Sequence, residues 1–172
     1  MKHLRIVLVL AALFPATFAG AAQPNLSNPA IDFPGYLRTA QEVDPVRRAH
    51  RLTEEEFLKM AAEPGTVVLD ARSADKYQLR HIKGAVGLPF TDFTEDTLAK
   101  VIPTKDTRVL IYCNNNFRGD ERAFARKFAG ASLNISTYVN LKVYGYKNIY
   151  ELGPLLDVDK TRLPFEGTAV SK

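Results

Sequence analysis

The sequence has little of several residue types, and each shortage narrows what the protein can do. Its 172 residues include one cysteine, Cys113, three histidines and no tryptophan. A single cysteine cannot form a disulfide within the chain, so Cys113 is a buried inert thiol, a thiol bonded to another molecule, or a reactive group. The histidines His3, His50 and His81 lack partners at metal-ligand spacing, so we expect no metal site and no cofactor.

Long apolar runs are missing as well. The apolar run near the start, Ile6 to Phe14, has nine residues, well short of the ~20 that a membrane-spanning helix needs. It follows a short basic start and precedes the small-residue stretch Ala19-Gly20-Ala21, which is the pattern of a secretory signal peptide. We therefore predict a signal peptide over residues 1–22, cleaved after Ala21 or Ala22. The protein would then be periplasmic or secreted, without stable membrane insertion after cleavage.

The chain carries 23 basic and 19 acidic residues. Two of the basic residues, Lys2 and Arg5, lie in the predicted signal peptide, and their removal from the 23 leaves 21 against 19. The densest basic cluster that remains, residues 47–51, is typical of a solvated surface. We therefore expect no nucleic-acid partner.

The remainder of the chain divides into three segments. Residues 23–49 are polar and contain four prolines, as in an N-terminal arm, with a short helix near 36–42. Residues 50–153 hold the regular helix and strand signals and are predicted to form one domain. Residues 154–172 are predicted to be a C-terminal tail packed on that domain. Three apolar residues of the tail are expected to make the contact: Leu155, Leu156 and Phe165.

Strand and helix signals alternate through the predicted domain. Thr53 and Glu56 have the spacing of a capping box, so a helix should begin there and end before Pro64. Short apolar and β-branched runs predict strands at 66–70, 85–88, 107–112 and 147–152. Further helices are expected at 74–79, 92–98, 119–128 and 134–144. This alternation predicts a parallel sheet with helices on both faces, and ligands bind such sheets outside the carboxyl ends of the strands.

Cys113 follows the clearest strand directly and therefore lies at such an end. The asparagines at 114–116 tolerate left-handed backbone angles, Arg118 adds a charge, and the predicted helix from Gly119 or Asp120 adds unpaired N–H groups. Together these features predict an anion cradle that favours the thiolate form of Cys113. The residues alone leave open a structural thiol at a buried strand end, or a plain asparagine-rich turn.

Four segments, in the same order, resemble the motifs of rhodanese-like domains. They are Val67–Arg72 with its D-x-R ending, His81–Pro89 (HIKGAVGLP), Val109–Cys113, and Tyr144–Leu152 (YGYKNIYEL). The resemblance covers about residues 50–153 and implies an α/β fold, a rhodanese-like parallel sheet flanked by helices on both faces. The stretch between the cysteine and the last motif is longer than is usual in the family. We therefore predict an extra helical segment near 134–144, after the active-loop helix.

The resemblance also implies a chemistry. The family carries a persulfide on the loop cysteine: the thiolate takes sulfane sulfur from a donor such as thiosulfate and passes it to a thiophilic acceptor such as cyanide or a thiol. Cys113 would be the nucleophile, and the loop would hold the persulfide and the oxyanion of the donor. The substrate-binding residues so implied are Asn114, Asn115, Asn116, Phe117, Arg118, Gly119 and Arg72. For Arg72 we favour pairing with Asp70, and for His81 a structural hydrogen-bonding role.

Two alternatives remain. The first is a cysteine phosphatase of related fold. Relatives of the family that act on phosphate have one residue more in the loop, so the six residues from Cys113 to Arg118 favour sulfur over phosphoryl transfer. The other alternative is a non-catalytic module that binds a protein partner or a small anion in the periplasm. It is favoured by Asp120 and Glu121, whose charges follow the loop and oppose anion binding.

Overall fold

The computed structural model describes residues 28–170. The predicted signal peptide, residues 1–22, and the first residues of the predicted arm lie outside this range. Among the described residues, no helix combines the length and the apolar character needed to cross a membrane.

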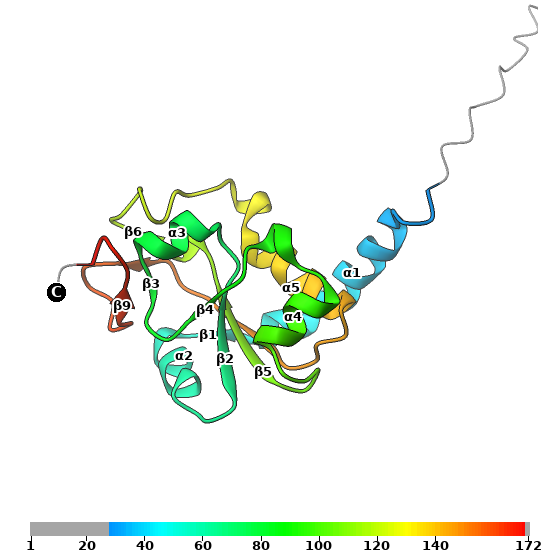
Figure 1. The fold of residues 1–172 in the computed structure, drawn as a ribbon, viewed down its shortest axis with the longest axis horizontal. Helices are drawn as coiled ribbons and strands as arrows, with labels where there is room; N and C mark the ends of the chain where they lie inside the picture. Colours follow the sequence, from blue (N-terminus) through cyan, green and yellow to red (C-terminus); the bar gives the residue numbers. More distant parts are fainter. Residues whose placement is uncertain (1–27, 171–172) are drawn as a thin grey trace, which may run out of the picture. The chain divides into compact units, whose positions relative to one another are not determined.

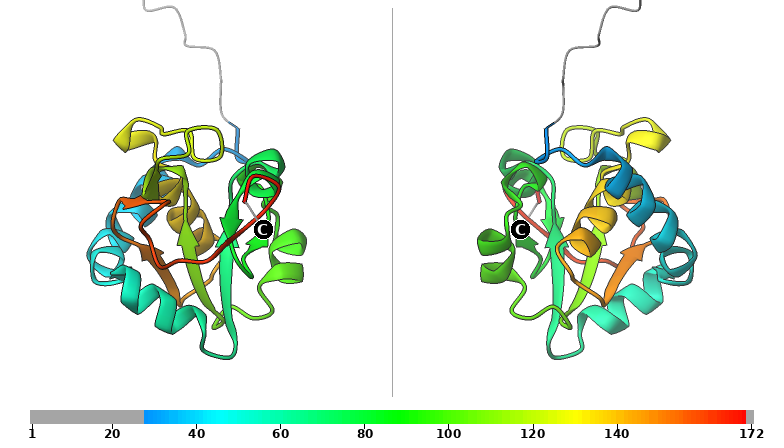
Figure 2. Two further views of the ribbon diagram at one scale, coloured as in Figure 1. Left: turned by 90° about the vertical axis from the view of Figure 1, so that its left-hand side faces the viewer. Right: turned by 90° about the vertical axis from the view of Figure 1, so that its right-hand side faces the viewer.

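A parallel sheet of five strands lies at the centre, in the order β1-β7-β5-β2-β4 (Figures 1 and 2). The strands are β1 (Arg51–Leu52), β2 (Thr66–Asp70), β4 (Val86–Gly87), β5 (Arg108–Tyr112) and β7 (Ile149–Leu152). Neighbouring strands are parallel throughout. The predicted α/β fold class is confirmed. All four predicted strands are present, and β1 is a fifth that the sequence pattern did not predict.

Helices cover both faces of this sheet. They are α1 (Phe33–Ala49), α2 (Glu54–Ala61), α3 (Ala74–Leu79), α4 (Glu95–Val101) and α5 (Leu133–Val143). Figure 1 shows α1, α4 and α5 on one side and α2 on the other. The Thr53–Glu56 capping box at the start of α2 is present, as predicted. The helix expected near 36–42 is longer than predicted, because Asp32 caps its first turn and it continues through Pro45.

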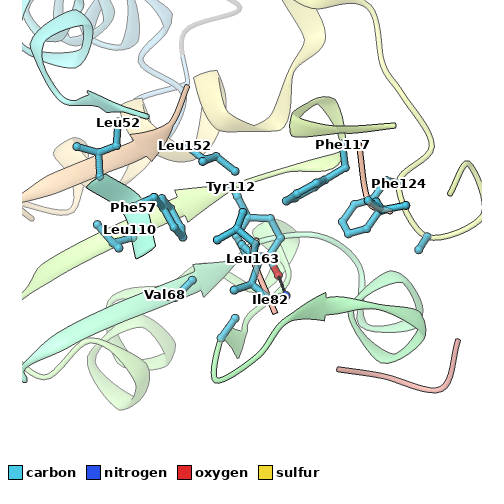
Figure 3. Close-up of a cluster of buried hydrophobic side chains, with 13 residues drawn as sticks. Leu52, Phe57, Val68, Ile82, Leu110, Tyr112, Phe117, Phe124, Leu152 and Leu163 are labelled. Carbon is cyan, nitrogen blue, oxygen red and sulfur yellow. Dashed lines mark hydrogen bonds between the residues drawn. The ribbon is translucent and has the colours of Figure 1, made fainter. Parts of the chain in front are cut away.

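Alternate residues of each central strand face opposite sides of the sheet, as the pleat requires. In β5, Leu110 and Tyr112 belong to the buried cluster on the α2 side, shown in Figure 3. Val109 and Ile111 belong to the cluster under α1, α4 and α5. Burial on both faces explains why this strand is an unbroken apolar run in the sequence.

The helix predicted over 119–128 is wrong. These residues belong to an irregular segment, residues 117–131, which we call the excursion; it crosses the end of the sheet at which the strands finish (Figure 2). Its first residues form strand β6 (Phe117–Arg118), paired with β8 (Leu156–Asp157), and its last form a 3-10 turn, Ala129–Ala131. The helical segment predicted near 134–144 is present as α5, which follows the excursion directly.

Tertiary contacts explain the absence of that helix. The rings of Phe117 and Phe124 lie 4.5 Å apart in the buried cluster of Figure 3. Only one turn forms between them, closed by the N–H of Phe124 on the carbonyl of Asp120 at 2.8 Å. Phe128, the last residue of the predicted helix, is 92% exposed. Burial of two aromatic rings therefore outweighs the local helical preference.

The C-terminal tail packs on the same cluster. Strand β9 (Phe165–Glu166) pairs antiparallel with β3 (His81–Ile82), and Leu156 and Phe165 contact the buried cluster. Leu155, which was also expected to pack, is about half exposed. Strands β8 and β9 fix the tail at two separate points, and Leu155 lies just before the first of them.

Candidate functional site

Cys113 lies at the carboxyl end of β5, where the sequence predicted a ligand site. Its side chain is only 1% exposed, but it lines a cavity of about 320 Å³. The Cys113 Sγ lies 3.4 Å from the Oγ of Ser132, the residue that precedes α5. The helix N-terminus beside the thiol is therefore that of α5 and not that of the predicted helix at 119.

Asn116 holds the backbone around the thiol. Its Oδ1 accepts from the N–H of Cys113 at 2.9 Å and from the Nδ2 of Asn134 at 3.0 Å. Its Nδ2 donates to the carbonyl of Leu152 at 2.7 Å and to that of Pro154 at 3.2 Å. One buried amide therefore joins the cysteine turn, α5 and the end of β7, and fixes the floor of the cavity.

The other two asparagines tie down the excursion. Asn114 Nδ2 donates to the carbonyl of Ala125 at 2.8 Å. Asn115 makes a pair of bonds with the backbone of Lys127, at 3.0 and 2.8 Å. The three form a 3-10 turn, and no non-glycine residue between 28 and 170 has a positive φ. The predicted cradle of left-handed asparagines is therefore not formed; Asn115 and Asn116 line the cavity through their position in this turn.

The chain leaves the cavity after Asn116. Phe117 is fully buried in the cluster on the α2 side, and Gly119, with φ +96°, turns the chain against Val158. Arg118 is 58% exposed, its Nε is 3.7 Å from Asp157 Oδ2, and it does not line the cavity. Phe117, Arg118 and Gly119 therefore do not surround the thiol as predicted. The six residues from Cys113 to Arg118 therefore do not define the size of an anion-binding loop. Their number gives no argument against a phosphate substrate.

Arg72 takes the structural role that the sequence favoured. Its Nη2 donates to Asp70 Oδ2 at 2.5 Å, and its Nη1 donates to the carbonyl of Ala123 at 2.9 Å, in the excursion. The Tyr112 hydroxyl donates to the same carboxylate at 2.5 Å. Burial, followed by the charge of Asp70, raises the pKa of Tyr112 well above its usual value, so this hydroxyl stays a donor. Arg72 lines a neighbouring cavity with Asn114, not the one that holds Cys113.

His81 is likewise engaged within the fold. Its Nδ1 lies 2.7 Å from the carbonyl of Tyr77, and its Nε2 lies 3.1 Å from Glu166 Oε1. Its ring stacks on that of Tyr77, with centroids 3.8 Å apart. These contacts join α3, β3 and β9, as expected for a structural histidine.

The two cationic groups in the Cys113 cavity come from the basic cluster at residues 47–51, which was predicted to be a solvated surface. Arg47, near the end of α1, and Arg51, in β1, line the cavity together with Glu151 of β7. Arg47 Nη2 lies 2.9 Å from Glu151 Oε1, and Arg51 Nε lies 3.0 Å from the same oxygen. Burial raises the pKa of Glu151, although the two guanidinium groups act in the opposite direction. The basic cluster itself, with two arginines four residues apart, was the available signal for this site. Nothing in the neighbouring sequence identified Glu151 as their partner.

Comparison with known proteins agrees with this architecture. The model of the rhodanese-like domain matches residues 53–153, more than half of the chain. The chain belongs to the rhodanese-like domain family. The match begins after Arg47 and Arg51, so both arginines lie outside the part of the chain that the family defines.

One curated relative and two solved structures show the range of the likeness. Thiosulfate sulfurtransferase PspE of Escherichia coli is 28% identical over 90 residues, which cover 52% of this chain and 71% of that protein. The BH2092 protein of Bacillus halodurans is 18% identical, with a TM-score of 0.52 over 77% of this chain and 88% of that chain. A complex of the EanB variant T414V with hercynine is 19% identical, with a TM-score of 0.50 over 68% of this chain and 27% of that chain. The two structures support the fold, and the curated relative shows that this sequence is similar to a sulfurtransferase.

Proposed function

We propose that this protein is a sulfurtransferase that carries sulfane sulfur as a persulfide on Cys113. The observation that carries the proposal is the position of the thiol, at the carboxyl end of β5, between the N-terminus of α5 and a cavity with two arginines. Membership of the rhodanese-like family and the likeness to a thiosulfate sulfurtransferase support it.

The proposed reaction has two displacement steps. The Cys113 thiolate attacks the outer sulfur of thiosulfate, the S–S bond breaks, and sulfite leaves with the electron pair. An acceptor such as cyanide or a thiolate then attacks the outer sulfur of the persulfide, and Cys113 leaves as thiolate. Asn116 would keep the cysteine backbone in place during both steps, and Asn115 would shape the cavity wall.

Intact mass spectrometry tests this proposal. The protein is incubated with thiosulfate, desalted and weighed, and the addition of one sulfur atom is expected. Because Cys113 is the single cysteine, its replacement by serine should abolish the gain. Addition of cyanide should return the original mass and release thiocyanate. A protein that gains no sulfur and forms no thiocyanate would refute the proposal.

A non-catalytic binding module is the second candidate. It is favoured by the near-complete burial of Cys113 and by the use of Asn114 and Asn115 to hold the excursion. For such a module, Cys113→Ser should leave the cellular function unchanged. Loss of function in that variant, with the fold intact by circular dichroism, would instead support the chemistry.

We also propose that the protein acts outside the cytoplasm. The support is the basic start followed by the apolar run and the Ala19-Gly20-Ala21 stretch, in residues that the structure does not describe. Expression of the full chain in a Gram-negative host should yield a periplasmic product that begins at residue 22 or 23. A product that keeps residues 1–22 and stays with the cytoplasmic fraction would contradict this.

A further inference from the structure

We propose that Arg47 and Arg51 form an anion subsite in the Cys113 cavity, which selects sulfur donors that carry a negatively charged oxyanion group. The inference deepens the proposed sulfurtransferase function and, for its choice of substrate, rests on it. Neither arginine falls within residues 53–153, which the family model matches.

The charge balance of the cavity wall supports an anionic ligand. Arg47, Arg51 and Glu151 are the charged residues that line this cavity in the described part of the chain. The Glu151 side chain is only 2% exposed, and both guanidinium groups contact it. One carboxylate compensates one of the two positive charges, so the wall keeps a net charge of about +1 next to the thiol.

Hydrogen-bond donors also remain for a ligand. A guanidinium has five N–H groups. Arg47 Nε donates to Glu151 Oε2, and Arg51 Nη2 donates to the carbonyl of Gly153. Arg47 Nη2 and Arg51 Nε lie at ion-pair distance from Glu151 Oε1. Within residues 28–170, neither Nη1 has a hydrogen-bond partner. Planar guanidinium groups hold sulfonate and carboxylate oxygens well, because two N–H groups can donate in parallel.

The asparagine turn and Arg118 do not offer side chains that could bind the oxyanion of a donor. The amide side chains of Asn114 and Asn115 are occupied by the excursion, and Arg118 points to Asp157. The arginines of α1 and β1 are therefore the cationic groups that can hold the oxyanion of thiosulfate. In the first displacement step they would also stabilise the sulfite that leaves.

Two alkylating reagents of similar size measure this subsite without sulfur transfer. Iodoacetate carries a carboxylate and iodoacetamide is neutral; in both, the Cys113 thiolate displaces iodide to form a carbon–sulfur bond. The ratio of their rate constants, followed by intact mass, cancels changes in the reactivity of the thiol itself. In wild type, the ratio should exceed that of free cysteine under the same conditions.

The variants have opposite expected effects. Arg47→Gln and Arg51→Gln should each lower the ratio about tenfold, and Glu151→Gln should raise it by a similar factor, because each changes one charge near the thiol. The double variant R47Q/E151Q restores the net charge and should return the ratio towards the wild-type value. The control is Arg48→Gln, since Arg48 is 67% exposed and pairs with Asp44 instead. Circular dichroism checks that each variant is folded.

The outcomes separate this inference from the proposed function. Persulfide loading from thiosulfate is measured on the same variants. If thiosulfate loads Cys113 but the ratio is the same in wild type, R47Q and R51Q, the anion subsite is refuted while the sulfurtransferase stands. If the ratio follows the charge but thiosulfate loads no sulfur, the subsite stands and the proposed function fails. A ratio lowered equally by E151Q and R47Q would show packing alone and would also overturn the subsite.

Discussion

Asn116 is the residue on which the geometry around the thiol depends most. Replacement by alanine leaves the buried N–H of Cys113 and the carbonyl of Leu152 without this partner. We expect Asn116→Ala to lower the free energy of unfolding by about 2–4 kcal/mol, measured by urea denaturation. Asn115→Ala is the matched control, because the Asn115 side chain bonds to the backbone of Lys127 and to no other group within residues 28–170. Its cost should be about 1 kcal/mol. Equal costs for the two variants would contradict this role.

Glu151 should make stability depend on pH in an unusual direction for a carboxylate. Burial raises its pKa above 4.5, despite the opposing arginines. Between the pKa of the unfolded chain and the raised pKa of the folded protein, the folded state binds more protons. The contribution of Glu151 to stability is therefore full below the unfolded pKa and is lost as the pH rises through the folded pKa.

Comparison with Glu151→Gln isolates this effect, because glutamine does not titrate. The difference in unfolding free energy, wild type minus E151Q, should fall as the pH rises from below 4.5. Urea denaturation at a series of pH values gives the difference directly. A difference that stays level or increases with pH would be inconsistent with the raised pKa.

The sequence predicted the local features of the site and not the distant ones. Cys113 at a strand end and the pairing of Arg72 with Asp70 depend on neighbours within a few residues, so both could be predicted. Arg47 could not be placed in the site, because Glu151 lies 104 residues further along the chain. A basic cluster whose partner is so distant has the same local pattern as a solvated surface.

The excursion is held by its aromatic residues, which gives a test with an internal control. Phe117 and Phe124 are buried, whereas Phe128 in the same segment is almost fully exposed. We expect Phe117→Ala and Phe124→Ala each to lower the free energy of unfolding by about 3–5 kcal/mol. Phe128→Ala should change it by less than about 0.5 kcal/mol. Thermal or urea unfolding of the three variants checks this, and a large cost at Phe128 would contradict the observed packing.

The same contrast explains which elements the sequence could predict. Strands β2 and β5 are mostly apolar and are buried on both faces, and α2 begins with a capping box, so each carries its own local signal. Ala123 and Phe124 lie within the helix that was predicted over residues 119–128. The structure buries them through a single turn because Phe117 and Phe165 surround Phe124 in space. Spacing alone does not distinguish an apolar helix face from two residues drawn into a core.

The tail is part of the folded molecule as a whole and not an appendage. Leu163 is buried, and the ring of Phe165 lies 5.2 Å from that of Phe117. A protein that ends at Arg162 should therefore lose about 3 kcal/mol or more of stability and show a lower melting temperature. Leu155→Ala, at a half-exposed tail position, serves as the control and should melt like wild type. An unchanged melting temperature in the shortened protein would contradict this.

The pairing of β1 with β7 has a consequence for how the molecule assembles. Arg51 is in register with Glu151, and Leu52 with Leu152. Ribosomal synthesis therefore makes α1 and β1 long before the strand that they need, and the first edge of the sheet stays open until about residue 152 has emerged. Contacts so distant in sequence form slowly and late in folding. Chains interrupted before β7 would expose the apolar side of α1 and would lack a completed cavity wall beside Cys113.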